Sequence, residues 1–296
     1  MRQPLNRFLL LQPVWLPTVL FIPLLYALGW LAALPLTLLG LPTDQLSLTG
    51  TVLSFVLFLA LMHRWVAVRW SAEKPWAALG ICRANPQEQP TPAAALLKGL
   101  LIAAGLLTVI TSVVLLEGSG DWRGEVDATQ LTNAVLLCFG VGFAEELIFR
   151  SWLWTELQEM IGSRRAALAQ ASIFSLVHTR FNLGLGAMGG LLIGLFLLGM
   201  VLARQRQSDQ GSLWGCIGLH GGLVAGWFLL QNGLLQLSPN APPWLVGPGG
   251  YSPNPLGGLV GIISLLILLL IQRKTVARAA RFSTGPSQDS RGEATP

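Results

Sequence analysis

The stretch FAEELIFRSWL, residues 143–153, places two carboxylates and a guanidinium inside a segment that is otherwise apolar. Glu145 and Glu146 are adjacent, and Arg150 follows four residues after the second of them. A charged side chain at the centre of a bilayer costs from about 2.5 to over 10 kcal/mol, depending on the reference state, so such residues mark functional sites. These three charges therefore need a functional or structural explanation.

The composition around this stretch is that of a membrane protein. The chain is 52% hydrophobic and 11% charged, with a mean hydropathy of +0.59, whereas a soluble domain carries about 25% charged residues. Many of its eleven tryptophans lie near the ends of apolar runs, as in the aromatic belts at membrane surfaces. These features predict an all-α fold, a polytopic bundle of membrane helices.

Eight apolar segments are long enough, or nearly long enough, to cross a bilayer, for which a helix needs about 20 residues. With the N-terminus in the cytoplasm, alternation places every Lys and Arg on the cytoplasmic side except Arg123, Arg150 and Arg180. The net charge of +5 therefore indicates orientation in a membrane, and no nucleic-acid partner is predicted. The sequence predicts about eight transmembrane helices with both termini cytoplasmic: 14–40, 47–69, 94–116, 131–157, 164–181, 184–203, 211–236 and 257–272.

The spacing of the three charges separates two roles. Positions four apart share a face of an α-helix, so Glu146 and Arg150 meet and reduce the cost of burying each other. Glu145 is rotated about 100° away from Glu146. A structural ion pair explains Glu146 and Arg150, but it leaves Glu145 unexplained.

Two histidines, His178 and His220, also lie inside apolar segments. Either histidine alone is compatible with a packing role. Counted along their helices, however, Glu145, His178 and His220 lie roughly 20, 21 and 14 Å from the cytoplasmic face. We expect them to meet near the middle of the membrane, with access from the cytoplasmic half. Such a group can bind a divalent metal, or it can activate water directly with Glu as the base.

The same residues resemble the motifs of the CPBP intramembrane proteases, a family of CAAX proteases and bacteriocin-processing enzymes that is also called the Abi family. EELIFR resembles its E-E-x-x-x-R motif, FSLVH its F-x-x-x-H motif, and SLWGCIGLH the motif that ends at His220. The resemblance implies catalytic roles for five residues. Glu145 activates water, Glu146 and Arg150 orient it, His178 acts with the base, and His220 stabilises the oxyanion. It also leaves open whether a metal such as zinc, held by Glu145, His178 and His220, takes part, or whether the enzyme works without one.

One position departs from the family pattern. Four residues after His220, where Asn or Asp is usual, the chain has Val224. Losing one oxyanion donor reduces the rate about 10²–10³-fold in a soluble protease, so Val224 puts catalysis in doubt without affecting the fold. The alternative function is a non-proteolytic scaffold, chaperone or immunity-type protein of the same family. A third hypothesis, a proton- or ion-coupled transporter, lacks the internal repeat that such proteins show.

The resemblance also divides the chain. We expect N-terminal spans and a connection over 1–77 and a CPBP-like core over 78–236. A Pro/Gly-rich far-side loop with the last span covers 237–272, and a disordered cytoplasmic tail covers 273–296. The loop 237–256 is too rich in Pro and Gly for a folded loop domain to be expected. The expected partners are the lipid bilayer and a peptide or membrane-protein substrate, with or without a lipid chain, in a bacterial inner membrane or a thylakoid-type membrane.

Overall fold

The computed structural model describes residues 2–250 and 252–283, and it confirms the predicted all-α fold, a polytopic bundle of membrane helices. Among these residues, five helical segments are long and apolar enough to cross a membrane. They are α2 (Trp15–Thr37), the 3₁₀ turn η1 (Thr43–Gln45) with α3 (Leu46–Arg69), α5 (Pro92–Leu116), the continuous helix Ala128–Ile161, and α9 (Leu185–Ser208).

The other three predicted spans are also helical, but their apolar helical stretches are shorter. They correspond to α8 (Ser163–Leu176), to α10 (Trp214–Leu229) with a π-helical turn η3 (Leu230–Leu234), and to α12 (Leu259–Ser283). Eight spans with cytoplasmic termini therefore remain a prediction. The helix α12 continues to Ser283, past residue 272 where the sequence predicts a disordered tail to follow, and 284–296 lie outside the described residues.

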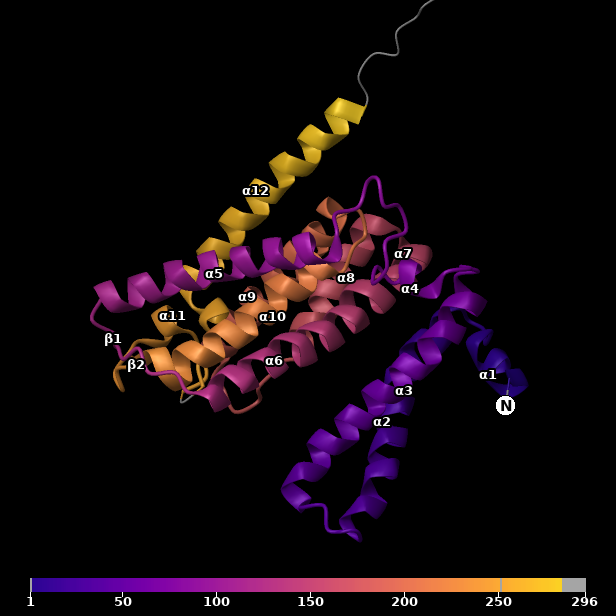
Figure 1. The fold of residues 1–296 in the computed structure, drawn as a ribbon, viewed down its shortest axis with the longest axis horizontal. Helices are drawn as coiled ribbons and strands as arrows, with labels where there is room; N and C mark the ends of the chain where they lie inside the picture. Colours follow the sequence, from indigo (N-terminus) through magenta and orange to yellow (C-terminus); the bar gives the residue numbers. More distant parts are fainter. Residues whose placement is uncertain (1, 251, 284–296) are drawn as a thin grey trace, which may run out of the picture.

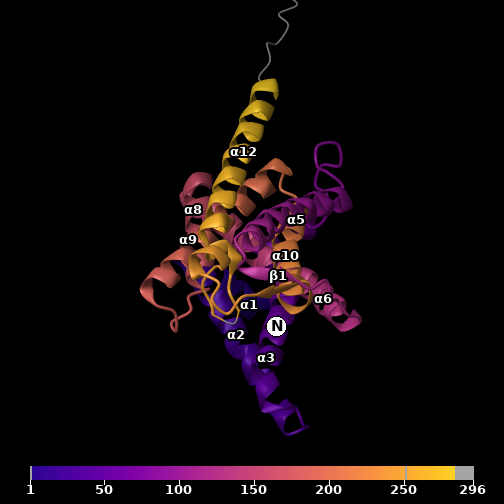
Figure 2. The ribbon, with the colours of Figure 1, turned by 90° about the vertical axis from the view of Figure 1, so that its left-hand side faces the viewer.

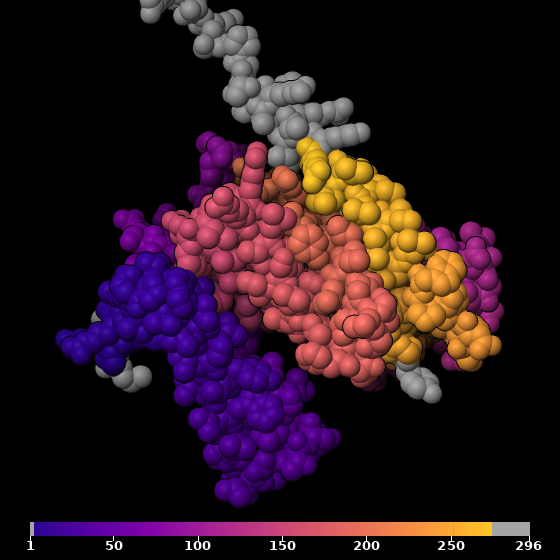
Figure 3. All heavy atoms as spheres, turned by 180° about the vertical axis from the view of Figure 1, so that it is seen from behind, coloured from indigo at the N-terminus to yellow at the C-terminus, as the bar shows by residue number. Residues whose placement is uncertain are grey.

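The N-terminal part forms a helical hairpin that projects from the rest of the molecule (Figures 1 and 3). After the short α1 (Arg2–Leu9), α2 and α3 pack against each other along their length. Gly29 makes this possible, because a Cβ there would lie 2.2 Å from Ser54 Oγ and 2.6 Å from the Gly50 carbonyl oxygen. The hairpin meets the other helices near Trp65 and Trp152, whose rings are 5.4 Å apart edge to face.

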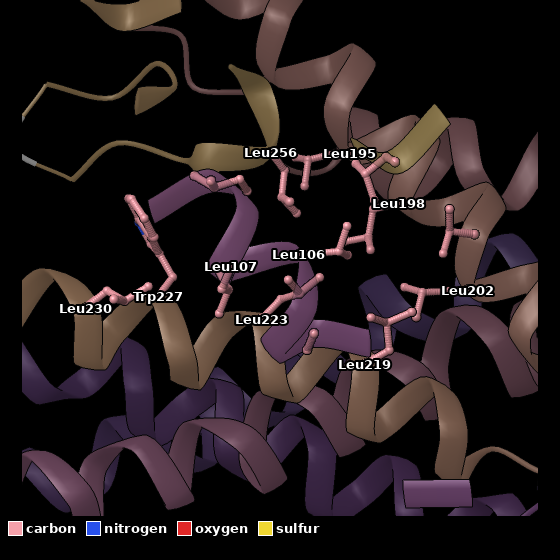
Figure 4. Close-up of a cluster of buried hydrophobic side chains, with 14 of the residues drawn as sticks. Leu106, Leu107, Leu195, Leu198, Leu202, Leu219, Leu223, Trp227, Leu230 and Leu256 are labelled. Atoms are coloured by element: carbon pink, nitrogen blue, oxygen red, sulfur yellow. The ribbon is translucent and has the colours of Figure 1, made fainter. Parts of the chain in front are cut away.

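The main hydrophobic core lies around α10, which packs against α5 and α6 (Ala128–Glu146), while α9 packs against α8 and α12 (Figures 1 and 2). The close-up in Figure 4 shows leucines of α5, α9 and α10 meeting Leu256 and Trp227. Burial of these side chains contributes about 1.5–3 kcal/mol each relative to exposure in water. The core thus fixes α10, and with it His220, between its neighbours.

The Pro/Gly-rich segment after α10 is folded, contrary to what its composition indicates. A short sheet pairs β1 (Gly120–Trp122) with β2 (Leu235–Leu237) antiparallel, and two short helices follow, α11 (Pro243–Val246) and the 3₁₀ turn η4 (Pro255–Gly257). Leu245, Val246 and Leu256 are buried in the main core. Composition does not predict this folded segment, because it packs through a few apolar side chains and through its backbone, which lies against Gly194 of α9.

Candidate active site

The helix that carries the motif begins at a complete capping box. Asp127 Oδ1 accepts from the Gln130 amide at 2.7 Å, and Gln130 Oε1 accepts from the Asp127 amide at 3.0 Å. After α6 the helix widens into a π-helical segment, η2 (Leu147–Leu153), and it then continues as α7 (Trp154–Ile161). π-helical turns are rare and are frequent at functional sites. Here the wide segment carries Arg150.

Glu146 is fully buried and accepts two hydrogen bonds on one oxygen. Arg150 Nη1 donates to Glu146 Oε1 at 2.9 Å, and His220 Nδ1 donates to the same oxygen at 2.7 Å. The hydrogen bond from His220 sets its tautomer, because a carboxylate can only accept. Glu146 therefore neutralises Arg150 and orients His220 at the same time.

Arg150 is also fully buried, and an aromatic ring and a second arginine surround it. Its guanidinium carbon lies 3.9 Å from the centroid of the Phe174 ring, which is a cation–π contact. The buried Arg206 of α9 donates to the carbonyl oxygen of Arg150 and, at 3.3 Å, to that of Gly211. These contacts fix the π-helical segment against α8 and α9.

The second histidine follows directly after α8. His178 Nδ1 donates to the Phe174 carbonyl oxygen at 2.6 Å, and the two rings are 4.8 Å apart. Phe174 is also 5.7 Å from His220, edge to face. A single phenylalanine therefore packs against Arg150 and against both imidazoles.

The remaining atoms of this group converge on Glu145. His178 Nε2 lies 3.6 Å from Glu145 Oε2, and His220 Nε2 lies 3.8 Å from the same oxygen. Because both imidazoles donate through Nδ1, each neutral ring presents the lone pair of Nε2. Glu145 Oε2 is itself buried and receives no hydrogen bond from the described residues. Three acceptors thus face one another, an arrangement suited to holding a water molecule, a proton or a cation.

The donor atoms of this group suit a divalent metal, since a carboxylate oxygen and two imidazole nitrogens fixed from behind are common zinc ligands. The positions of these side chains are less suitable for holding a metal ion. Within residues 2–250 and 252–283, no group of three or more His, Cys, Asp or Glu side chains is placed to hold a metal ion. The side chains thus fit a metal by their chemistry but not by their present spacing.

A cavity of about 250 Å³ opens from the three acceptors. Its walls are mostly apolar and include several leucines that Figure 4 shows, among them Leu195, Leu198 and Leu223. Val224 lines it as well. The far wall is formed by Arg180 and residues 252–256, at the end of the bundle that holds β1 and β2 (Figure 1). The sequence predicts access from the cytoplasmic half, whereas the cavity extends toward the loops that the charge pattern places on the other side.

Residues 127–226 match the family model for type II CAAX prenyl endopeptidase Rce1-like proteins. These residues make up about a third of the chain and are called the Rce1-like domain below. The match confirms the resemblance to the CPBP family. A second model, described as a domain of unknown function (DUF8676), matches residues 3–74, which contain the N-terminal hairpin. No curated protein and no solved structure matched the chain.

The Rce1-like domain contains all five residues that the sequence motifs single out, and the structure brings all five together. The chain is therefore an integral membrane protein that carries a domain of the CAAX protease family. Sequence reasoning missed Arg206, which positive charge alone assigns to a cytoplasmic helix end. It also missed Asn254, which lies outside the matched range and lines the cavity. No sequence signal distinguishes these two residues from other polar residues in loops and helix ends.

Proposed function

We propose that this protein is an intramembrane endopeptidase that hydrolyses a peptide bond with a water molecule activated by Glu145. The observation that carries the proposal is the meeting of three acceptor atoms, from Glu145, His178 and His220, at the inner end of an apolar cavity. Glu145 receives no hydrogen bond from the described residues, although it lies beside two oriented imidazoles. A purely structural role does not require such an arrangement. A hydrolase does require a base and a place for water.

The chemistry starts with a water molecule held between Glu145 and His178. As Glu145 takes a proton, the water oxygen forms a bond to the carbonyl carbon of the peptide, and the carbonyl electron pair moves onto its oxygen. The tetrahedral intermediate then expels the amine nitrogen, which receives the proton from Glu145. The carbon–nitrogen bond breaks, and the products are a carboxylate and an amine.

His220 lies where it can face the developing oxyanion. Its Nδ1 donates to Glu146, and a ring that already carries a second proton on Nε2 before the water attacks donates that N–H to the oxyanion and keeps the proton throughout. Arg150 balances the charge of Glu146 in the ground state. The apolar walls exclude bulk water, which strengthens these electrostatic interactions.

The substrate that suits this cavity is a peptide or a membrane-protein segment, with or without a lipid chain, reached from the bilayer of a bacterial inner membrane or a thylakoid-type membrane. Nucleic acid is not among the proposed partners. A divalent metal such as zinc is the second proposal for the same site. Glu145, His178 and His220 would hold it, and it would supply Lewis-acid activation of water.

A second candidate function is a non-proteolytic membrane scaffold or chaperone. Val224 favours it, since this apolar residue lines the cavity one helical turn from His220, where a polar donor is usual in the family. A scaffold needs the fold but does not need Glu145 as a base. The two functions therefore differ in their response to the loss of that carboxylate.

The deciding experiment compares protein termini by mass spectrometry in membranes from cells that lack the protein. The cells are complemented with wild type, with Glu145→Gln, or with the matched control Glu117→Gln at equal expression. Glu117 is exposed at the end of α5, outside the cavity. New termini with wild type and Glu117→Gln, but not with Glu145→Gln, are expected. Identical termini in every strain, with normal physiology in the Glu145→Gln strain, would favour the scaffold.

A further inference from the structure

The cavity has three polar residues that the sequence motifs do not explain, namely Arg180, Ser252 and Asn254. Residues 252–256 form part of its wall, and Asn254 is the one residue of that stretch with a side-chain amide. The position that the family uses for a polar donor is filled by Val224 in the same cavity. In this cavity, α10 thus has an apolar side chain at position 224, and the segment 252–256 contributes an amide.

The orientation of the Asn254 amide follows from one hydrogen bond. The backbone N–H of Leu256 points at the side chain at 3.1 Å, and a donor must be met by an acceptor, which is Oδ1. The other end of the amide, Nδ2, makes no hydrogen bond with any residue that the structure describes. Asn254 is thus held by its oxygen and presents an N–H₂ donor without a partner.

The segment that carries Asn254 is held at several points. Trp227 Nε1 donates to the Pro253 carbonyl oxygen at 2.8 Å, and the Asn254 amide donates to the Pro248 carbonyl oxygen at 2.8 Å. On the other side, the Leu256 carbonyl oxygen lies 2.1 Å from where a Cβ on Gly194 would stand. Close approach of this kind requires glycine. The donor is therefore preorganised, as transition-state stabilisation requires.

The segment 252–256 contacts the same face of α10 that carries His220. Val224 and Trp227 follow His220 by four and seven residues, so the three side chains share one face of α10. Trp227 binds the residue directly before Asn254. Asn254 therefore lines the cavity near Trp227, beyond Val224 along α10 from His220.

We infer that Asn254 Nδ2 donates a hydrogen bond to a carbonyl oxygen of the peptide in the cavity, and that it takes over the function of the polar residue absent at position 224. This inference rests on the proposed peptidase function. Two other nearby polar side chains already make a hydrogen bond within the protein. Arg180 Nη1 donates to the Ser252 carbonyl oxygen at 3.3 Å, and Asn232 Nδ2 donates to the Phe228 carbonyl oxygen at 2.8 Å.

The test uses Asn254→Asp, because an aspartate keeps the oxygen that accepts from Leu256 but has no N–H₂ donor. Asn and Asp are equally good in such capping positions. The rate at which Glu145-dependent termini appear in isolated membranes is expected to fall about 10²–10³-fold. Adding Val224→Asn to this variant places an amide one turn from His220, and it is expected to recover about tenfold or more of the lost rate.

The matched control is Asn240→Asp, the same change in the same Pro/Gly-rich segment but outside this cavity. Thermal unfolding of the purified variants shows whether the fold is kept, and Asn254→Ser provides a second variant that still caps η4. An Asn254→Asp protein that cleaves as fast as Asn240→Asp overturns the inference alone. A wild type without Glu145-dependent termini overturns the proposed function and the inference together. Rescue by Val224→Asn without a gain in thermal stability supports a donor to the substrate rather than a structural role.

Discussion

One buried carboxylate of the Rce1-like domain binds four side chains at the N-terminal hairpin, and this junction allows a sharp test. Glu156 of α7 is 2% exposed. It accepts hydrogen bonds from Trp65 Nε1 and Trp70 Nε1 at 2.7 Å each and from Thr18 Oγ1 at 2.7 Å. Arg69 pairs with it at 2.6 Å. All four donors belong to the hairpin or to the residue that ends it.

The change Glu156→Gln keeps the size of the side chain and removes its charge. The retained oxygen can still face the two indoles, but the new N–H₂ group then stands against the guanidinium of Arg69, donor against donor. Two charge-assisted hydrogen bonds of about 1.5–3 kcal/mol each are lost. Removing one partner of a buried ion pair costs about 3–5 kcal/mol, which agrees with that sum. We therefore expect a loss of about 3–5 kcal/mol in the free energy that holds the hairpin to the domain.

Equilibrium unfolding in mixed detergent micelles, followed by tryptophan fluorescence, measures this loss directly because Trp65 and Trp70 contact the substituted residue. Hydrogen exchange then locates the effect, which should be concentrated in α2 and α3. The control is Glu159→Gln, an exposed residue in the same helix. Equal unfolding midpoints for Glu156→Gln and Glu159→Gln would refute the reasoning.

Three further predictions concern the site and its surroundings. Phe174→Leu removes the ring against Arg150, which is worth about 2 kcal/mol in a desolvated site, so thermal stability and the cleavage rate should both fall. Gly194→Val should displace the loop at Leu256 and lower the unfolding midpoint, whereas Gly186→Val, with nothing within 4 Å, should not. If Glu145 activates water without a metal, cleavage should survive dialysis against a zinc chelator. Loss of cleavage that added zinc restores would favour the metal scheme.

Sequence reasoning located the motif residues because their relations are local or periodic. Glu146 and Arg150 meet through the four-residue spacing, and this pairing persists although the segment is π-helical from Leu147. The convergence of His178 and His220 on Glu145 follows from counting residues along three helices. Helix geometry sets the first relation and the similar depth of the other three residues, whereas tertiary packing decides which helices lie side by side.

The remaining features depend on contacts between distant segments. Thr18 and Glu156 are 138 residues apart, and nothing in either local sequence indicates their hydrogen bond. Asn254 lines the cavity because Trp227 and Gly194 hold its segment, and composition alone describes that segment as a loose Pro/Gly-rich loop. Propensity is a poor guide where a segment is stabilised by side chains from other helices.

The charges around Glu145 permit a final distinction between catalysis and structure. Glu146 pairs with Arg150, Arg206 donates to the carbonyl oxygen of Arg150, and Glu145 is adjacent in sequence to Glu146, so Glu145→Gln also changes the local charge balance. Glu145→Asp keeps the charge and withdraws the carboxylate by one methylene group. A misplacement of about 1 Å can cost about 10²-fold in rate, so a catalytic Glu145 predicts a folded but nearly inactive Asp variant.

A purely structural charge predicts the opposite result. Glu145→Asp would then support cleavage at the wild-type rate, while Glu145→Gln would be unstable as well as inactive. Measuring termini and thermal unfolding on both variants separates the two explanations, because only catalysis depends on the position of the carboxylate as well as on its charge. If the Asp variant cleaves normally, the base must be sought elsewhere, and the three converging acceptors would be a structural feature of the Rce1-like fold.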